Sequence, residues 1–113
     1  MLTLAIILFA IGVLFGLIVL TSFLRHGVTP KGSVIVHGIL ILIALILVIV
    51  YVTNNKPGPL VAMVMFIITA VFGFALLAID LSRKPLPRFL VFLHPFLAAI
   101  SLIVLIIWTV SAH

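Results

Sequence analysis

The stretch KGSVIVHGILILIALILVIVY, residues 31–51, decides the fold because its pattern occurs twice in the chain. The second copy, RFLVFLHPFLAAISLIVLIIW, covers residues 88–108, which is a shift of 57 positions. Each copy begins with a basic residue, carries a histidine six positions later and ends on an aromatic residue. The shift pairs Lys31 with Arg88, His37 with His94, Tyr51 with Trp108, Phe9 with Phe66 and Gly16 with Gly73. The sequence therefore predicts a two-helix unit written twice, with repeat units of about residues 1–56 and 57–113.

The composition predicts an integral membrane protein. Of the 113 residues, 67% are hydrophobic and 6% are charged, whereas soluble domains carry roughly 25% charged residues. A soluble chain this short could not bury so much apolar surface, because a small fold has a large surface for its volume. The length leaves room for a single domain, residues 1–113, whose partner is the lipid bilayer.

Charge and cysteine content exclude several functions. The chain has no cysteine, which removes disulfides, thiolate metal sites and thiol chemistry. The net charge of +5 comes from basic residues in short loops beside apolar runs. At such positions basic residues set topology and contact anionic lipid, so no nucleic-acid partner is expected. No hydrolase or transferase motif is present, which leaves a redox role as the enzymatic possibility.

Four apolar runs, residues 2–24, 33–52, 60–81 and 89–110, are each long enough to cross the hydrocarbon of a bilayer. Backbone polar groups in lipid must be satisfied within a helix or a closed barrel, and barrel strands would alternate in polarity. The runs are apolar throughout, so we predict an all-α fold. The short loops force neighbouring helices to be antiparallel. The predicted architecture is an up-down-up-down four-helix bundle.

The loop charges predict an orientation. The second loop holds only Lys56, while the first and third loops hold the other basic residues: Arg25, Lys31, Arg83, Lys84 and Arg88. Positively charged loops stay on the cytoplasmic side, so both termini are expected outside the cytoplasm. The compact set of spans favours a bacterial inner membrane.

Residues outside the repeat's shared pattern receive local interpretations. Asp80, the single acidic residue, is expected to pair with Lys84 four positions later. His26 lies in a loop and His113 at the end of the chain, so both are expected to be solvated. Pro95 follows the second core histidine and predicts that the fourth helix is kinked or starts late.

The two repeated histidines carry the functional hypothesis. His37 and His94 each lie six residues past a matched base, about 9 Å inside the cytoplasmic end of their helices at 1.5 Å per residue. The second and fourth helices of an up-down bundle are diagonal partners, so the two imidazoles should face each other at one depth. Polar residues inside a span face the interior and are functional candidates. Two facing imidazoles can supply both axial ligands of one haem.

Small and basic residues surround this pair in a way that suits a flat, anionic ligand. Gly16 and Gly73 lie on the intervening helices, where they would make room for the edges of a porphyrin. Haem propionates would point toward the nearer membrane surface. Arginine and lysine side chains are available there to bind them: Arg25, Lys31, Arg83 and Arg88.

Through His37, His94, Gly16 and Gly73 the chain resembles the membrane b-type cytochromes. In that family, histidines on alternate helices of a four-helix bundle hold haem b, and glycines on the intervening helices make room for it. The resemblance implies one haem b per chain, with iron bound by the two histidines, and one-electron transfer with a quinone or a redox partner protein. Members that move electrons across the membrane stack two haems on four core histidines. This chain has two, so a homodimer or a docked partner would have to complete such a path.

Other functions remain open at this point. A structural or assembly subunit would use the histidines as packing groups and bind no cofactor. The chain matches the small multidrug-resistance transporters in length, but its first span lacks the membrane glutamate on which they depend. A divalent metal site would fall short of the four ligands that zinc prefers.

Overall fold

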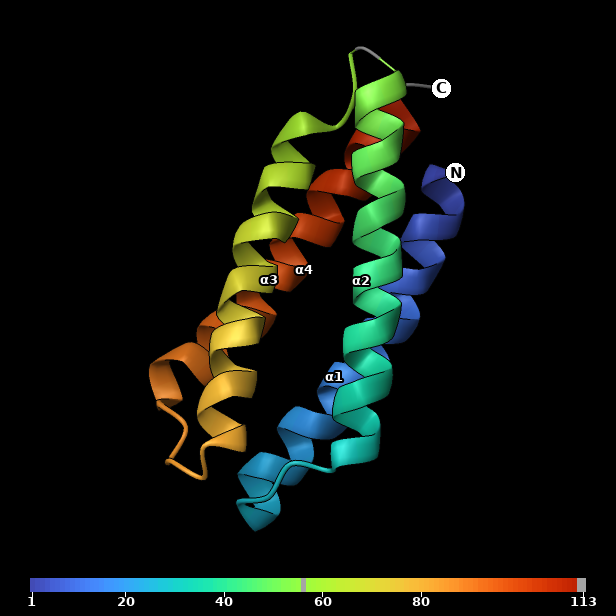
Figure 1. Cartoon of the computed structure of the whole chain (residues 1–113). Helices are drawn as coiled ribbons and strands as arrows, with labels where there is room; N and C mark the ends of the chain where they lie inside the picture. Colours follow the sequence, from blue (N-terminus) through green and yellow to red (C-terminus); the bar gives the residue numbers. More distant parts are fainter. Residues whose placement is uncertain (56, 112–113) are drawn as a thin grey trace.

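A computed structural model describes residues 1–55 and 57–111, so Lys56 and His113 lie outside the described residues. The chain forms four antiparallel helices, α1 (Leu2–His26), α2 (Lys31–Asn54), α3 (Leu60–Leu81) and α4 (Arg88–Ser111) (Figure 1). All four are long and apolar enough to cross a membrane. The prediction of a membrane-spanning four-helix bundle is confirmed.

Three of the four helices extend beyond the predicted spans. The helix α1 ends at His26, which is exposed, and α2 begins at Lys31 rather than at Ser33. The helix α4 begins at Arg88 and continues through Pro95, so the expectation of a late start was wrong. The bundle is 44 Å long, longer than the roughly 30 Å of hydrocarbon. Polar residues in the headgroup region still make backbone hydrogen bonds within the helix, which explains the one or two residues added at these helix ends.

Prolines mark where three helices begin. Pro30, Pro59 and Pro87 each directly precede a helix, and each carbonyl accepts the first hydrogen bond of that helix, at 3.0, 3.0 and 3.1 Å. Proline has no N–H to lose at a helix start, and its fixed φ suits that position. The turn before α2 also contains Gly27, whose φ of 70° closes the end of α1.

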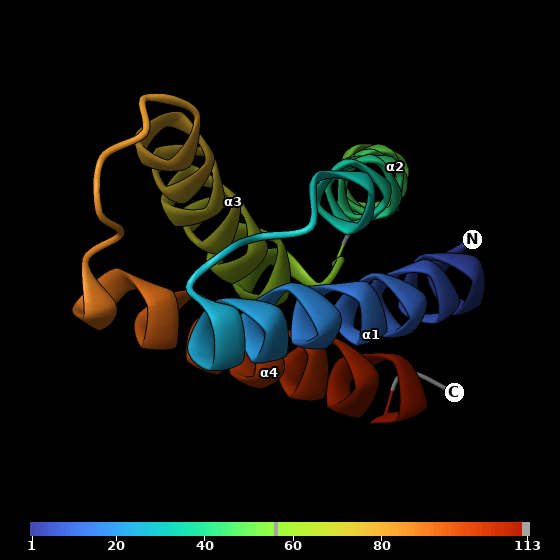
Figure 2. The same cartoon turned by 90° about the horizontal axis from the view of Figure 1, so that it is seen from below.

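The bundle consists of two hairpins. The helices α1 and α2 pack closely on each other, as do α3 and α4, whereas contacts between the hairpins, α1 with α4 and α2 with α3, are sparser. The helices α2 and α4 therefore lie diagonally, as predicted. Toward the end that carries the first and third loops the two hairpins diverge (Figures 1 and 2). We call this end, with residues 27–30 and 82–87, the basic end.

The well-packed core lies in the other half of the bundle. Phe9 stacks on Phe66 with ring centroids 3.9 Å apart, and Tyr51 meets Trp108 edge to face at 6.2 Å. Around them the most deeply buried side chains come from all four helices: Ala5, Ala44, Val48, Ala62, Ser101 and Leu105. Both aromatic pairs join residues that the 57-position shift relates. The two hairpins are therefore arranged about an approximate twofold axis that runs along the bundle.

The outer surface is that of a protein solvated by lipid. Large apolar side chains are exposed along every helix, among them Leu14 on α1, Ile35 on α2, Phe74 on α3 and Ile107 on α4. A soluble monomer rarely exposes extended apolar surface. The chain is an integral membrane protein whose partner is the lipid bilayer.

A candidate cofactor site at the paired histidines

Each core histidine is fixed by a backbone carbonyl of its own hairpin. His37 Nδ1 lies 2.7 Å from the carbonyl oxygen of Gly12, and His94 Nδ1 lies 3.0 Å from that of Thr69. A carbonyl oxygen only accepts, so each Nδ1 must carry a hydrogen and donate it. In a neutral ring the lone pair is then on Nε2, the usual arrangement of a histidine that binds a metal.

The two imidazoles meet across the bundle axis, as the repeat predicts. The ring centroids of His37 and His94 are 6.2 Å apart and the ring planes are 86° apart. Two metal–nitrogen bonds of about 2 Å and two ring radii of about 1 Å together span about 6 Å between the centroids of two axial imidazoles. The distance between the ring centroids is therefore compatible with one metal ion bound by both imidazoles.

Both Nε2 atoms are available for a ligand. Neither has a hydrogen-bond partner in the described part of the chain, and no buried side-chain nitrogen or oxygen there lacks one. Since His37 and His94 are only half-buried, their Nε2 atoms must retain accessible surface. A polar atom that is left open in a membrane interior favours the presence of a ligand.

The repeated glycines seat the imidazole rings. A Cβ atom on Gly16 would lie 3.0 Å from His37 Cε1, and one on Gly73 would lie 2.9 Å from His94 Cε1. Such distances are too short for a carbon–carbon contact, so only glycine lets the ring lie against the neighbouring helix. Sequence analysis predicts that these two glycines lie against the edge of a porphyrin. That contact stays a prediction, and the imidazole is the neighbour observed.

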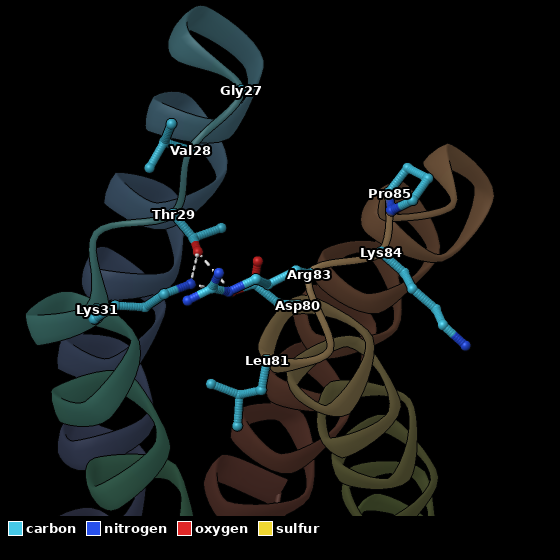
Figure 3. Close-up of a pocket in the computed structure, with 9 residues that line it drawn as sticks. All are labelled: Gly27, Val28, Thr29, Lys31, Asp80, Leu81, Arg83, Lys84 and Pro85. Carbon is cyan, nitrogen blue, oxygen red and sulfur yellow. Dashed lines mark hydrogen bonds and ion pairs between the residues drawn. The ribbon is translucent and has the colours of Figure 1, made fainter.

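Two of the four predicted propionate partners line one cavity. Lys31 and Arg83 face a cavity of about 700 Å³ between the two loops of the basic end (Figure 3). Arg25 and Arg88 do not line this cavity. Lys31 starts the helix that carries His37, so the cavity lies about 9 Å along the bundle from the imidazole level.

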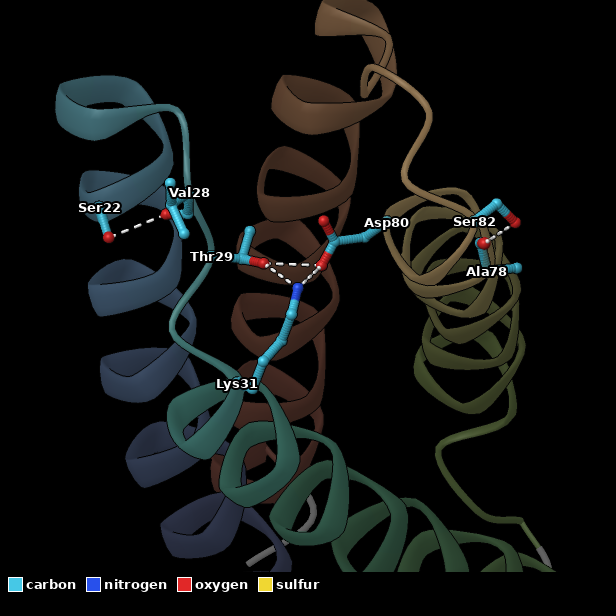
Figure 4. A network of polar contacts seen from close by, with 7 residues as sticks. All are labelled: Ser22, Val28, Thr29, Lys31, Ala78, Asp80 and Ser82. Atoms are coloured by element: carbon cyan, nitrogen blue, oxygen red, sulfur yellow. Dashed lines mark hydrogen bonds and ion pairs between the residues drawn. The ribbon is translucent and has the colours of Figure 1, made fainter.

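The expected pairing of Asp80 with Lys84 was wrong. The Asp80 carboxylate accepts hydrogen bonds from Lys31 Nζ at 2.5 Å and from Thr29 Oγ1 at 2.6 Å, both of which belong to the other hairpin (Figure 4). Lys31 Nζ also donates to Thr29 Oγ1, at 2.8 Å. Lys84 would have been a helical neighbour of Asp80, but α3 ends at Leu81 and the chain turns before reaching it. We call the contact of Thr29, Lys31 and Asp80 the interhairpin clasp.

Sequence reasoning missed the acceptors of the two histidines. Gly12 and Thr69 offer only their backbone carbonyls to the rings, and a carbonyl leaves no trace in residue type. A signal did exist, because the 57-position shift pairs Gly12 with Thr69, and each lies 25 residues before its histidine. Thr29 was also missed, since nothing local marks a loop threonine as the partner of a distant carboxylate.

No protein family, curated protein or solved structure matches the chain. Within residues 1–55 and 57–111, no three or more histidine, cysteine or acidic residues come together to hold a metal ion. Two nitrogen ligands alone suit a metal whose other positions are filled by a macrocycle.

Proposed function

We propose that the chain is a membrane haem b protein that holds one haem between His37 and His94, near the basic end, and takes part in one-electron transfer. The observation that carries the proposal is the geometry of the pair. The two rings are 6.2 Å apart on the bundle axis, each fixed through Nδ1 and each with an accessible Nε2. A hydrogen-bonded Nδ1 and a free Nε2 are typical of a histidine that binds a metal, and cofactors in helix bundles bind between facing helices.

The protein's part in the reaction is to hold the haem and to shield it. Bound haem supplies a reversible one-electron couple at its iron. The Gly12 and Thr69 carbonyls fix the ring orientation and raise the basicity of Nε2, as hydrogen bonds to metal-bound histidines do. His37 and His94 would both bind the haem iron, which would favour electron transfer over binding of oxygen.

The packing of the bundle favours electron exchange at one end of the molecule. The half beyond the histidines is filled by the Phe9–Phe66 and Tyr51–Trp108 pairs, whereas the hairpins diverge toward the basic end (Figure 1). In this proposal electrons enter and leave at the basic end. By the positive-inside rule this end faces the cytoplasm and both termini lie outside, in a bacterial inner membrane. The partner is a quinone or a redox protein, and a homodimer would carry one haem per chain.

Spectroscopy of purified protein with haem supplied during expression tests the proposal. We expect a reduced-minus-oxidised spectrum of low-spin haem b, with one haem per chain. His37→Ala and His94→Ala should each abolish it. His26→Ala is the matched control, because His26 is exposed at the end of α1, and it should leave the spectrum unchanged. A folded, colourless wild-type protein would overturn the proposal.

A structural role without cofactor is the second candidate, and one observation favours it. Both Nδ1 bonds stay within a single hairpin, so each histidine already ties two helices together. Hydrogen bonds between membrane helices contribute about 0.6 kcal/mol on average. If this is the whole role, each alanine variant loses about that much stability and the wild type never binds haem. The haem spectrum and the unfolding measurement on the same samples separate the two candidates.

A further inference from the structure

The open cavity at the basic end is large enough for a ligand of its own. It occupies about 700 Å³ between the loop after α1 and the loop after α3, within the range of about 300–1,000 Å³ that is typical of ligand sites. Its lining residues come from the basic end (Figure 3), about 9 Å along the bundle from the level of the paired histidines.

The charges around the cavity favour an anion. Lys31, Arg83 and Lys84 line it together with a single carboxylate, that of Asp80, which leaves a net charge of +2. Asp80 is already engaged by Lys31 and Thr29 in the interhairpin clasp. No ion pair to Arg83 is present within residues 1–55 and 57–111. Arg83 and Lys84 are thus the two cations that line this cavity without an ion pair in the described part of the chain.

The backbone of Arg83 holds its side chain over the cavity. Its φ is 60°, and it is the only non-glycine residue with positive φ in the described ranges. Such a conformation is strained for a residue with a side chain. Figure 3 shows the Arg83 side chain pointing across toward Thr29 and Lys31, while Lys84 points away. Lys84 therefore offers a matched control of equal charge and adjacent position.

The remaining walls indicate an amphiphile. Val28, Leu81 and Pro85 line the same cavity as the cations, and Val28 and Leu81 are both well exposed. The cavity lies just past the ends of membrane-spanning helices, at the depth of lipid headgroups. A phosphodiester beside apolar groups has the matching chemistry, and basic residues at this depth bind anionic headgroups.

We propose that this cavity binds the phosphate group of an anionic phospholipid, with Arg83 as its principal donor and Lys31 as the second. A guanidinium can bind two phosphate oxygens at once, which explains why arginine occupies the position that reaches across. Lipid binding would bridge the two hairpins at the end where their own packing is sparse.

Native mass spectrometry of the protein in nanodiscs of phosphatidylglycerol and phosphatidylcholine tests the proposal. We expect phosphatidylglycerol to be retained selectively by the wild type and about tenfold more weakly by Arg83→Gln, because charge-assisted hydrogen bonds are lost. Arg83→Gly should lose retention equally while relieving the backbone strain, so a folding defect cannot explain the result. Lys84→Gln should change retention less than twofold.

Three results would count against the lipid. Equal retention by all variants would overturn the site, as would an equal loss in Lys84→Gln, which would indicate diffuse surface charge. A second arm titrates detergent-solubilised, delipidated protein with inorganic phosphate. Binding of phosphate that depends on Arg83, without selective lipid retention, would keep the anion site and overturn its assignment to a phospholipid. All these measurements are made without haem, so their outcome can be distinguished from that of the test of the proposed function.

Discussion

Phe9 and Phe66 stack face to face on the bundle axis, with ring centroids 3.9 Å apart and ring planes 4° apart. They come from different hairpins and are related by the repeat. Both are almost fully buried. They form an apolar packing contact between the two hairpins, in the half of the bundle away from the basic end.

Removing either ring should loosen this joint. We expect Phe9→Ala and Phe66→Ala each to destabilise the bundle. The same substitution in the core of a soluble protein costs about 3–5 kcal/mol, and the loss here should be smaller because lipid also solvates apolar side chains. The double variant should cost less than the sum of the two, since both substitutions delete one contact. Unfolding in detergent followed by circular dichroism measures these losses. Phe74→Ala, at a well-exposed position on α3, is the control and should change little.

Alanine at the repeated glycines should displace the imidazoles. In Gly16→Ala the new methyl group would lie 3.0 Å from His37 Cε1, and in Gly73→Ala 2.9 Å from His94 Cε1. Overpacking costs about 1–3 kcal/mol, so haem affinity should fall about tenfold or more in each variant. Haem titration monitors this, and Gly38→Ala is the control because nothing lies within 4 Å of its added carbon. Unchanged affinity in both repeat variants would show that the rings can move aside freely.

The interhairpin clasp should contribute little to overall stability. Lys31 and Asp80 side chains are 54% and 22% exposed, and ion pairs this open contribute about 0–1 kcal/mol. We therefore expect Asp80→Asn to unfold within about 1 kcal/mol of the wild type. Its pairing should weaken with added salt. A much larger loss on unfolding in detergent would mean that the clasp lies in a drier setting than its exposure indicates.

Cross-linking can report on the distance between the loops at the basic end. The chain has no cysteine, so Thr29→Cys with Asp80→Cys introduces a unique pair at side chains now 2.6 Å apart. A short bifunctional thiol reagent should join them rapidly in membranes. Ser22→Cys with Asp80→Cys is the comparison, because Ser22 bonds to the Val28 carbonyl of its own hairpin (Figure 4). Equal rates for the two pairs would contradict the clasp.

The fold was predictable because the bilayer leaves so few alternatives. Apolar runs without alternation must be helices in lipid, and short loops order them. Only the helix ends were misjudged, by one or two residues, where the chain leaves the hydrocarbon yet stays helical: His26, Lys31, Asn54, Arg88 and Ser111. Hydropathy reports the thickness of the hydrocarbon and not where the backbone hydrogen bonds stop.

The candidate site was predictable only as far as the repeat reached. The facing of His37 and His94 followed from their matched places, and ring contact confirms it. The partner of Asp80 did not follow, because the rule for helical neighbours fails where a helix ends and Lys31 is 49 residues away. Contacts to backbone carbonyls, and contacts between residues far apart in the chain, carry no local sequence pattern.

The approximate twofold axis has a consequence for what each half can become. In a dimer of two identical hairpins, the twofold axis would relate identical residues at every pair of matched positions. Joined head to tail in one polypeptide, the two hairpins are free to diverge at positions that the repeat relates: Gly12 and Thr69, Ala44 and Ser101, Tyr51 and Trp108. A cofactor on that axis would therefore experience unlike surroundings on its two faces, which a symmetric dimer cannot provide.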